Sequence, residues 1–119
     1  MWFCKNCLDI TVQNVLLAPI IDIYNKLWNL QAIFPEPHAL LGRDKDFLGG
    51  GRLGGLFHPI GDATEDIIIC EGYATGASLH TATGLLTLCA LSANNLLKVA
   101  RSVRAVDPRK KITICADPV

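Results

Sequence analysis

Residues 67–78 read IIICEGYATGAS, and this stretch decides the fold. It begins with four apolar residues, three of them β-branched, which is typical of a strand buried on both faces of a parallel sheet. Small and polar residues follow and open a predicted helix. Because ligands of open α/β sheets bind outside the carboxyl ends of the strands, we expect the carboxylate of Glu71 to face such a crevice. Gly72 lets the backbone turn sharply beside the first N–H groups of the helix, which favour anions.

The second half of the chain continues this alternation of strand and helix. Thr75 is the predicted N-cap of the first helix and Gly84 its predicted end. Ser92 is predicted to cap a second helix, which Asp107 and Pro108 terminate. The βαβαβ order predicts a mostly parallel, Rossmann-like sheet with right-handed crossovers. The predicted elements are a strand at 67–70, a helix at 75–83, a strand at 85–91, a helix at 93–106 and a strand at 112–116.

Two acids stand at predicted strand ends, Glu71 after the strand at 67–70 and Asp117 after the strand at 112–116. Mg²⁺ takes oxygen ligands and is commonly held by one or two carboxylates together with water and substrate phosphates. Phosphoryl and nucleotidyl transfer need such a metal to neutralise developing charge. The sequence therefore predicts a two-carboxylate crevice for Mg²⁺ or Mn²⁺. The alternative is that Glu71 is only a surface acid at a strand end.

The first half of the chain is predicted to be antiparallel and β-rich, which makes the fold class α/β within an α+β chain. Residues 1–14 form a weakly patterned lead-in, and the β-rich segment covers 15–61. A hairpin is expected from strands at 15–24 and 27–34, joined by a two-residue turn at Asn25 and Lys26. Pro19 places the first of these strands at a sheet edge or a bulge. The second strand is expected to direct Trp28, Leu30, Ala32 and Phe34 to one face. Short strands are expected at 45–48 and 56–61, around a glycine-rich turn at 49–55.

Composition narrows the class of protein. The chain has 119 residues, half of them apolar, and a formal net charge of zero, so nucleic-acid binding would have to come from local patches. No secretory signal and no run near the roughly 18 apolar residues of a membrane helix is present. The chain has five cysteines, an odd number, and three of them lie in apolar strand-like runs. Together with the preceding observations, this predicts a reduced, cytoplasmic protein without a membrane segment. Cys4 and Cys7 have the spacing of half a zinc site, but no second pair accompanies them.

Residues 66–84 and the later strand ending at Asp117 resemble the TOPRIM domain, and in particular the TOPRIM module of primases from phages and conjugative plasmids. The string EGYATGASL at 71–79 is long and quite specific to that group. A similar β-rich segment precedes the module in the plasmid-type primases. It is recognisable here in LWNLQ at 27–31, GGR at 50–52 and FHPIG at 57–61. The resemblance covers roughly residues 15–117.

The resemblance implies a nucleotidyltransferase of DNA replication that makes RNA primers on single-stranded DNA from nucleoside triphosphates, with a replicative helicase or other replication proteins as partners. It implies that Glu71 and Asp117 are the catalytic and metal-binding acids. In the family, an Asp-x-Asp motif follows the later strand, whereas this chain has Asp117, Pro118 and Val119. Val119 stands where the second aspartate is expected. We therefore expect a TOPRIM module at 66–119 that is either incomplete at its C-terminal end or degenerate.

Basic residues of the first half are the candidates for contacts to phosphates. By resemblance, Arg43, Lys45 and Arg52 would guide the template or the nucleotide, with Gly72 and Thr75 beside them at the start of the first helix. Lysine binds phosphate as a point charge and arginine can bind it with two hydrogen bonds. The alternative is that the three cations are solvated surface residues around a loop. Lys98, Arg101 and Arg104 form a basic stripe that any amphipathic helix would show.

Two other functions stay open from the sequence. Because the second aspartate of the motif is missing, the chain is also compatible with a non-catalytic module that binds nucleic acid or a replication partner. The same acids would serve a TOPRIM nuclease or topoisomerase relative, although a topoisomerase needs a nucleophilic tyrosine, a role for which Tyr24 and Tyr73 have no special features. The β-rich first half favours the primase.

Overall fold

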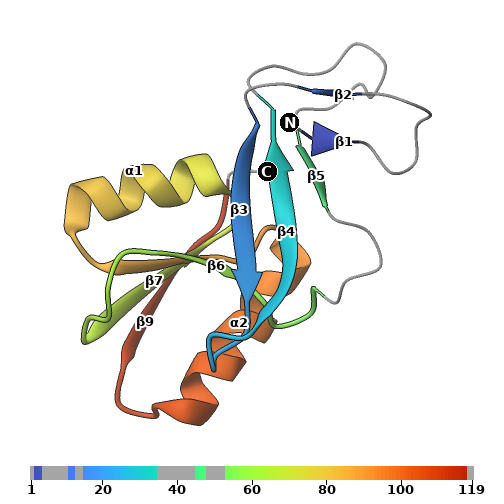
Figure 1. The fold of residues 1–119 in the computed structure, drawn as a ribbon. Coiled ribbons are helices and arrows are strands. Elements are labelled where there is room, and N and C mark those ends of the chain that lie inside the picture. Colours follow the sequence, from blue (N-terminus) through green and yellow to red (C-terminus); the bar gives the residue numbers. More distant parts are fainter. Residues whose placement is uncertain (1, 4–10, 13–14, 35–44, 48–52, 118–119) are drawn as a thin grey trace.

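The computed structural model describes residues 2–3, 11–12, 15–34, 45–47 and 53–117. Its strands form a two-stranded sheet β1-β2, a three-stranded sheet β3-β4-β5 and a four-stranded sheet β6-β8-β7-β9 (Figure 1). The predicted α+β class is confirmed. The elements are β1 (Trp2–Phe3), β2 (Thr11–Val12), β3 (Leu16–Ile21), β4 (Leu27–Ile33), β5 (Lys45–Phe47), β6 (His58–Ile60), β7 (Asp66–Cys70), α1 (Tyr73–Thr83), β8 (Leu86–Cys89), α2 (Ala93–Val106) and β9 (Lys111–Cys115).

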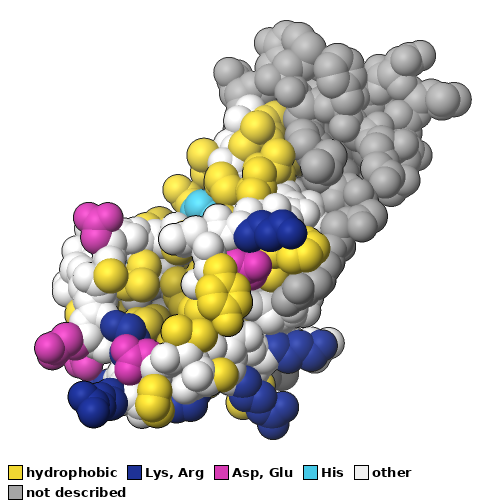
Figure 2. Space-filling view, turned by 60° about the horizontal axis from the view of Figure 1, so that its bottom comes forward, with side chains coloured by type: hydrophobic (Ala, Val, Ile, Leu, Met, Phe, Trp, Pro, Cys, Tyr) yellow, Lys and Arg dark blue, Asp and Glu magenta, His cyan; other side chains and the backbone are white. Residues whose placement is uncertain are grey.

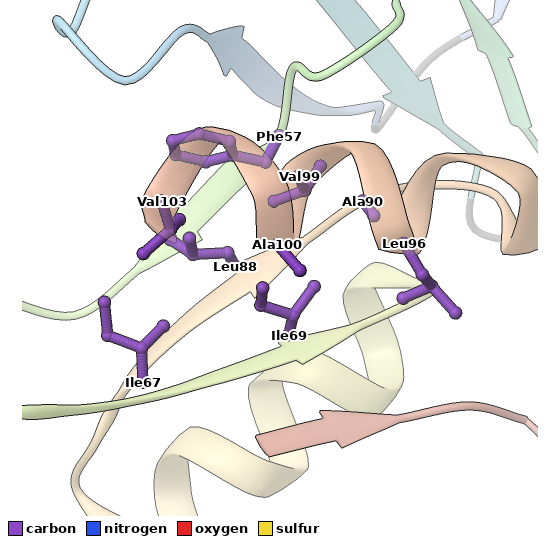
Figure 3. Packing of buried hydrophobic residues seen from close by; sticks show 9 residues of the cluster. All are labelled: Phe57, Ile67, Ile69, Leu88, Ala90, Leu96, Val99, Ala100 and Val103. Carbon is purple, nitrogen blue, oxygen red and sulfur yellow. The ribbon is translucent and has the colours of Figure 1, made fainter. Parts of the chain in front are cut away.

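The four-stranded sheet is the largest of the three, and both helices pack against it; it is called the larger sheet below. β7 lies inside it and pairs in parallel with β8 on one side and with β9 on the other. β6 pairs antiparallel with β8, so the sheet is mostly parallel, as the sequence predicts. β6 comes from the end of the segment that sequence analysis assigned to the β-rich first half. The two helices cover opposite faces of this sheet (Figures 1 and 3).

The main hydrophobic core lies between α2 and one face of the larger sheet (Figure 3). The buried apolar side chains of α2 face the sheet, and Val99 and the opposing Ile69 are both fully buried. Burying a side chain of this size stabilises the fold by roughly 1.5–3 kcal/mol, so this layer fixes the position of β7. The cluster consists of Phe57, Ile67, Ile69, Leu88, Ala90, Leu96, Val99, Ala100 and Val103.

On the other face, α1 approaches the sheet closely at Gly76. A Cβ atom at this position would lie 2.4 Å from the sulfur of Cys89 and 3.1 Å from that of Cys70. Because glycine has no side chain, α1 can pack directly against two buried thiols. Gly84 ends the helix with φ at 72°, and its N–H donates to the carbonyl of His80, which confirms the predicted stop.

The smaller sheet is built on the β3–β4 hairpin, whose connection differs from the prediction. Residues 22–26 join the strands instead of a two-residue turn, and Asn25 has φ at 66°. Asp22 explains the longer loop, because its Oδ1 atom accepts hydrogen bonds from the backbone N–H groups of Tyr24 and Lys26. The other oxygen accepts the indole N–H of Trp28. β3 lies at the sheet edge, as Pro19 predicts.

The expected facing of β4 is only partly correct. Ala32 and Phe34 are buried, but Trp28 is exposed, whereas Asn29 and Gln31 on the alternate face are buried. The buried residues of β4 therefore come from both faces of the strand, and its exposed residues, Leu27 and Trp28, stand at its beginning. Strict alternation in the sequence could not show this pattern.

Hydrogen bonds join the hairpin to the larger sheet. Ile21 and Phe57 exchange two backbone hydrogen bonds of 2.9 and 3.1 Å. The Nδ1 atom of His58 lies 2.7 Å from the carbonyl oxygen of Pro19. These contacts fix the end of the hairpin against β6, and so connect the hairpin to the larger sheet.

We predict that Gly76→Ala destabilises the protein by about 1–2 kcal/mol. The added methyl group would lie 2.4 Å from the sulfur of Cys89, so the overpacking cost falls near the upper end of its usual range, at about 2–3 kcal/mol, whereas alanine gains roughly 1 kcal/mol over glycine inside a helix. Urea denaturation followed by circular dichroism measures the change. Ser78→Ala, at an exposed position of the same helix, is the control and should stay within about 0.5 kcal/mol of the parent. Equal stability of the two variants would contradict this packing.

Candidate acidic site at the carboxyl edge of the larger sheet

Glu71 follows the last residue of β7 and lies directly before α1. Gly72 is the N-cap of that helix and supplies no side-chain hydrogen bond to its first turn. No acidic residue occupies the first turn either. The early N–H groups of α1 thus keep the free donors that make a helix N-terminus attractive to anions. Glu71 is half-buried beside them.

The parallel pairing of β7 with β9 brings the second predicted acid to the same place. Cys70 is in register with Cys115, so the residues after both strands emerge side by side. The backbone N–H of Asp117 donates a hydrogen bond of 3.3 Å to the Oε1 atom of Glu71, across 46 positions of sequence. The Asp117 side chain is exposed. The structure therefore brings together the two carboxylate residues that the sequence proposes.

The backbone of Glu71 is held from the opposite side by the segment after β8. The N–H of Leu91 donates to the carbonyl of Glu71 at 2.6 Å, and the N–H of Ala90 donates to that of Cys70 at 2.8 Å. Leu91 has φ at 73°, in the left-handed region. This conformation costs a non-glycine residue roughly 1–2 kcal/mol, and it allows the segment to follow β7 beyond the end of the strand.

Two thiols lie beneath this edge. Cys70 and Cys89 are in register on neighbouring strands, fully buried, with their sulfur atoms 3.9 Å apart. The hydrogen bond between the thiols and their burial raise the pKa of Cys89, which therefore stays protonated. We assign this pair to packing beneath α1, as the apolar strand pattern predicts.

Asn95 links three segments beside the site, and sequence analysis did not single it out. Its Oδ1 atom accepts the N–H of Gly55 at 2.7 Å. Its Nδ2 group donates to the carbonyl oxygens of Leu56 and Ala90 at 2.8 and 2.9 Å. One buried amide thus connects the end of the glycine-rich stretch, the loop that holds Glu71, and α2. The sequence feature that could have identified Asn95 is its position four residues before Val99, on the apolar face of α2.

The remaining predicted site residues divide into two groups. Gly72 lies at the edge, next to Glu71, whereas Thr75 is not the N-cap: α1 begins at Tyr73, and Thr75 lies within its first turn. The helix starts earlier because Gly72, already extended at φ −99° and ψ 162°, serves as the cap residue. The backbone of Lys45 begins β5. Its side chain, and both Arg43 and Arg52, lie outside the described residues.

The donor chemistry of the edge fits a divalent metal that is only partly held by protein. Glu71 and Asp117 offer carboxylate oxygens, the ligand type that Mg²⁺ prefers, and one or two such groups are its usual protein share. Within the described residues, no group of three or more His, Cys, Asp or Glu side chains is arranged to hold a metal. Val119, at the position of the second aspartate of the family motif, lies outside that part of the chain.

With the geometry established, comparison with known proteins identifies the class of domain. Residues 66–118 match the model of the Toprim domain, and this part of the chain belongs to that family. Over 104 residues, the chain is also 33% identical to two Escherichia coli proteins named DNA primase TraC. These alignments cover 83% of this chain but only 7% and 9% of the two primases. No solved structure matches the chain.

Among the described residues, neither α1 nor α2 has the length and apolar character needed to cross a membrane.

We predict that Asn95→Ala destabilises the protein by about 2–6 kcal/mol, because it leaves the buried carbonyl groups of Leu56 and Ala90 without partners, at about 1–3 kcal/mol for each. The midpoint of urea denaturation measures the loss. Asn94→Ala removes the same side chain at the neighbouring, exposed position and should change stability by less than about 0.5 kcal/mol. Similar effects of the two substitutions would show that the Asn95 contacts contribute little.

Proposed function

We propose that the acidic edge binds the phosphates of a nucleoside triphosphate through Mg²⁺ or Mn²⁺, within a primase-type protein that makes RNA primers on single-stranded DNA. The observation that carries this proposal is the 3.3 Å contact between the Asp117 N–H and the Glu71 carboxylate. It supports a shared site for two acids that are far apart in sequence. The similarity to DNA primase TraC supports the choice of reaction. Because the chain spans less than a tenth of those relatives, the primase activity is proposed for a larger protein.

Glu71 and Asp117 would hold the metal, which when bound neutralises charge on the phosphates and on the transferring group. The chain's own contribution is orientation. Glu71 is fixed through its carbonyl by Leu91 and through its carboxylate by the backbone of Asp117. Gly72 and the first N–H groups of α1 offer additional donors to phosphate oxygens. Preorganised groups of this kind need no rearrangement when charge develops.

Arg43, Lys45 and Arg52 are proposed to guide the template or the nucleotide towards this edge. Support comes from the anchoring of the segment that follows Arg52. Gly55 and Leu56 are bound to Asn95, which also binds the carbonyl of Ala90, next to the residue that holds Glu71. The end of the glycine-rich stretch is therefore coupled to the acidic edge by hydrogen bonds.

We further propose a reducing compartment, the cytoplasm, for this protein. Cys70, Cys89 and Cys115 are free thiols in the structure, and two of them are fully buried in the thiol layer beneath α1. Thiols that serve as core packing are typical of proteins kept under reducing conditions.

A non-catalytic nucleic-acid-binding module is the second candidate. The residue Val119 at the second aspartate position favours it, since two carboxylates hold a metal more weakly than three. Such a module would bind nucleic acid with a strong dependence on salt but without dependence on Mg²⁺. A primase-type site requires the metal for tight binding of the triphosphate.

We predict that Glu71→Gln weakens Mg²⁺-dependent binding of a nucleoside triphosphate at least about tenfold, or about 1.4 kcal/mol, because the amide lacks the charge of the carboxylate. Isothermal titration calorimetry with and without Mg²⁺ measures the effect. Glu65→Gln removes the same charge from an exposed residue before β7, at the opposite end of that strand, and should bind like the parent. Lys45→Ala is expected to weaken binding as well.

Equal binding by Glu71→Gln, Lys45→Ala and the parent would show that the site assignment is wrong. Nucleic-acid binding that is sensitive to salt, unaffected by Mg²⁺ and unaffected by Glu71→Gln, in a chain that binds no triphosphate, would favour the module without chemistry.

A further inference from the structure

A hollow of about 290 Å³ lies between the turn of the β3–β4 hairpin and α2. Its lining includes the small residues Gly55, Ser102 and Ala105, which we call its floor, and Tyr24 of the turn. Gly55 packs tightly here, because a Cβ atom at its position would lie 3.2 Å from the hydroxyl of Ser102. In Figure 1 the hairpin turn reaches α2 on the side away from α1. This hollow is not part of the acidic site.

Tyr24 is the most exposed of the large hydrophobic residues at this turn, with 80% of its surface accessible. Its backbone is nevertheless fixed, since its N–H donates to Asp22 at 2.8 Å and the N–H of Asn25 donates to the carbonyl of Asp22 at 3.0 Å. An aromatic ring that is exposed on a fixed backbone loses little freedom when a flat partner stacks on it. The face of a nucleobase is such a partner.

Two cations stand beside this hollow on α2. Lys98 lies four positions before Ser102, Arg101 lies four positions before Ala105, and the two cations are three positions apart, so they share a helix face with the floor of the hollow. The Nζ atom of Lys98 would be 3.9 Å from a Cβ atom at Gly54, which places its ammonium group over the glycine-rich stretch. Both side chains are exposed, and within the described part of the chain neither forms a salt bridge. Their charge is available to an anion.

Asp22 is the acidic group that borders the hollow, and its charge is directed into the turn. Its oxygens accept the indole N–H of Trp28 and the backbone N–H groups of Lys26 and Tyr24. The hydrogen bond from Trp28 is the main reason that the pKa of Asp22 lies below its ordinary value. Lys26 adds a positive charge on the same turn, with Nζ 4.3 Å from the centre of the Trp28 ring. Figure 2 shows this end of the molecule, where lysine and arginine side chains lie among hydrophobic ones.

We propose that this hollow binds single-stranded nucleic acid, with one base stacked on Tyr24 above the small-residue floor and neighbouring phosphates on Lys98 and Arg101. The proposal deepens the proposed function, on which it rests, by assigning a surface to the template strand. An exposed aromatic ring beside cations is the arrangement that single strands use, because only unpaired bases present a free face. A duplex would reach the cations but not Tyr24.

The test is fluorescence anisotropy of a short labelled oligothymidylate with the 119-residue chain, in buffer without divalent metal. Tyr24→Ala should weaken binding by about 5- to 100-fold, the range for loss of one stacked base. Tyr24→Phe keeps the ring and should bind like the parent. The double variant Lys98→Ala/Arg101→Ala should lower the slope of log affinity against log salt by about 1.4, at 0.7 for each phosphate. All three positions are exposed, so the variants are expected to fold.

The charge control is Arg109→Ala/Lys111→Ala, which removes two exposed cations away from the hollow and should leave the salt slope nearly unchanged. Equal losses in the two double variants, unchanged binding by Tyr24→Ala, or equal binding of a duplex would each overturn the proposal. An oligouridylate of the same length shows whether RNA is bound as well as DNA. Because the assay contains no divalent metal, its outcome does not depend on whether the acidic edge binds Mg²⁺. Failure of the metal site, measured by triphosphate binding, is thereby distinguished from failure of this surface.

Discussion

The parallel pairing of β7 with β9 is the interaction on which the rest of the structure depends. It places Cys70 opposite Cys115, and the residues that follow must then emerge at the same edge of the sheet. The backbone of Asp117 consequently meets the carboxylate of Glu71. A shift of one residue in this register would turn Ile67 and Ile69 away from the core beneath α2 and towards α1. The core that stabilises the fold is therefore also what fixes the two acids.

A second constraint couples the β-rich half to this edge. Asn95 holds the end of the glycine-rich stretch and the carbonyl of Ala90, while the next residue, Leu91, holds the backbone of Glu71. The exchange of hydrogen bonds between Ile21 and Phe57 fixes the hairpin to the same body. The described end of the glycine-rich stretch, at Gly55 and Leu56, and the residues expected to hold a metal thus belong to one connected framework, with the Toprim domain as its larger part.

Much of this arrangement could be predicted from the sequence because its signals are local. The run at 67–70, the glycine after the first helix and the apolar residues of α2 predicted the elements, and the positions of Glu71 and Asp117 at strand ends predicted that these acids lie together. The predicted start of α1 and the predicted length of the hairpin loop were wrong by a few residues. Gly72 serves as the N-cap residue although it has no side chain, and Asp22 stabilises a longer turn through its hydrogen bonds. The left-handed Leu91 could not be foreseen, because tertiary hydrogen bonding imposes a conformation that leucine disfavours.

The central claim is that Glu71 and Asp117 form one metal site, and Mn²⁺ tests it most directly. Paramagnetic broadening of amide signals in NMR spectra reports which residues lie near the ion. The account predicts that substoichiometric Mn²⁺ first broadens the signals of Glu71, Gly72 and Asp117, that excess Mg²⁺ restores them, and that Glu71→Gln abolishes the effect. Broadening spread over the exposed acids, unchanged in Glu71→Gln while the fold stays intact, would contradict it.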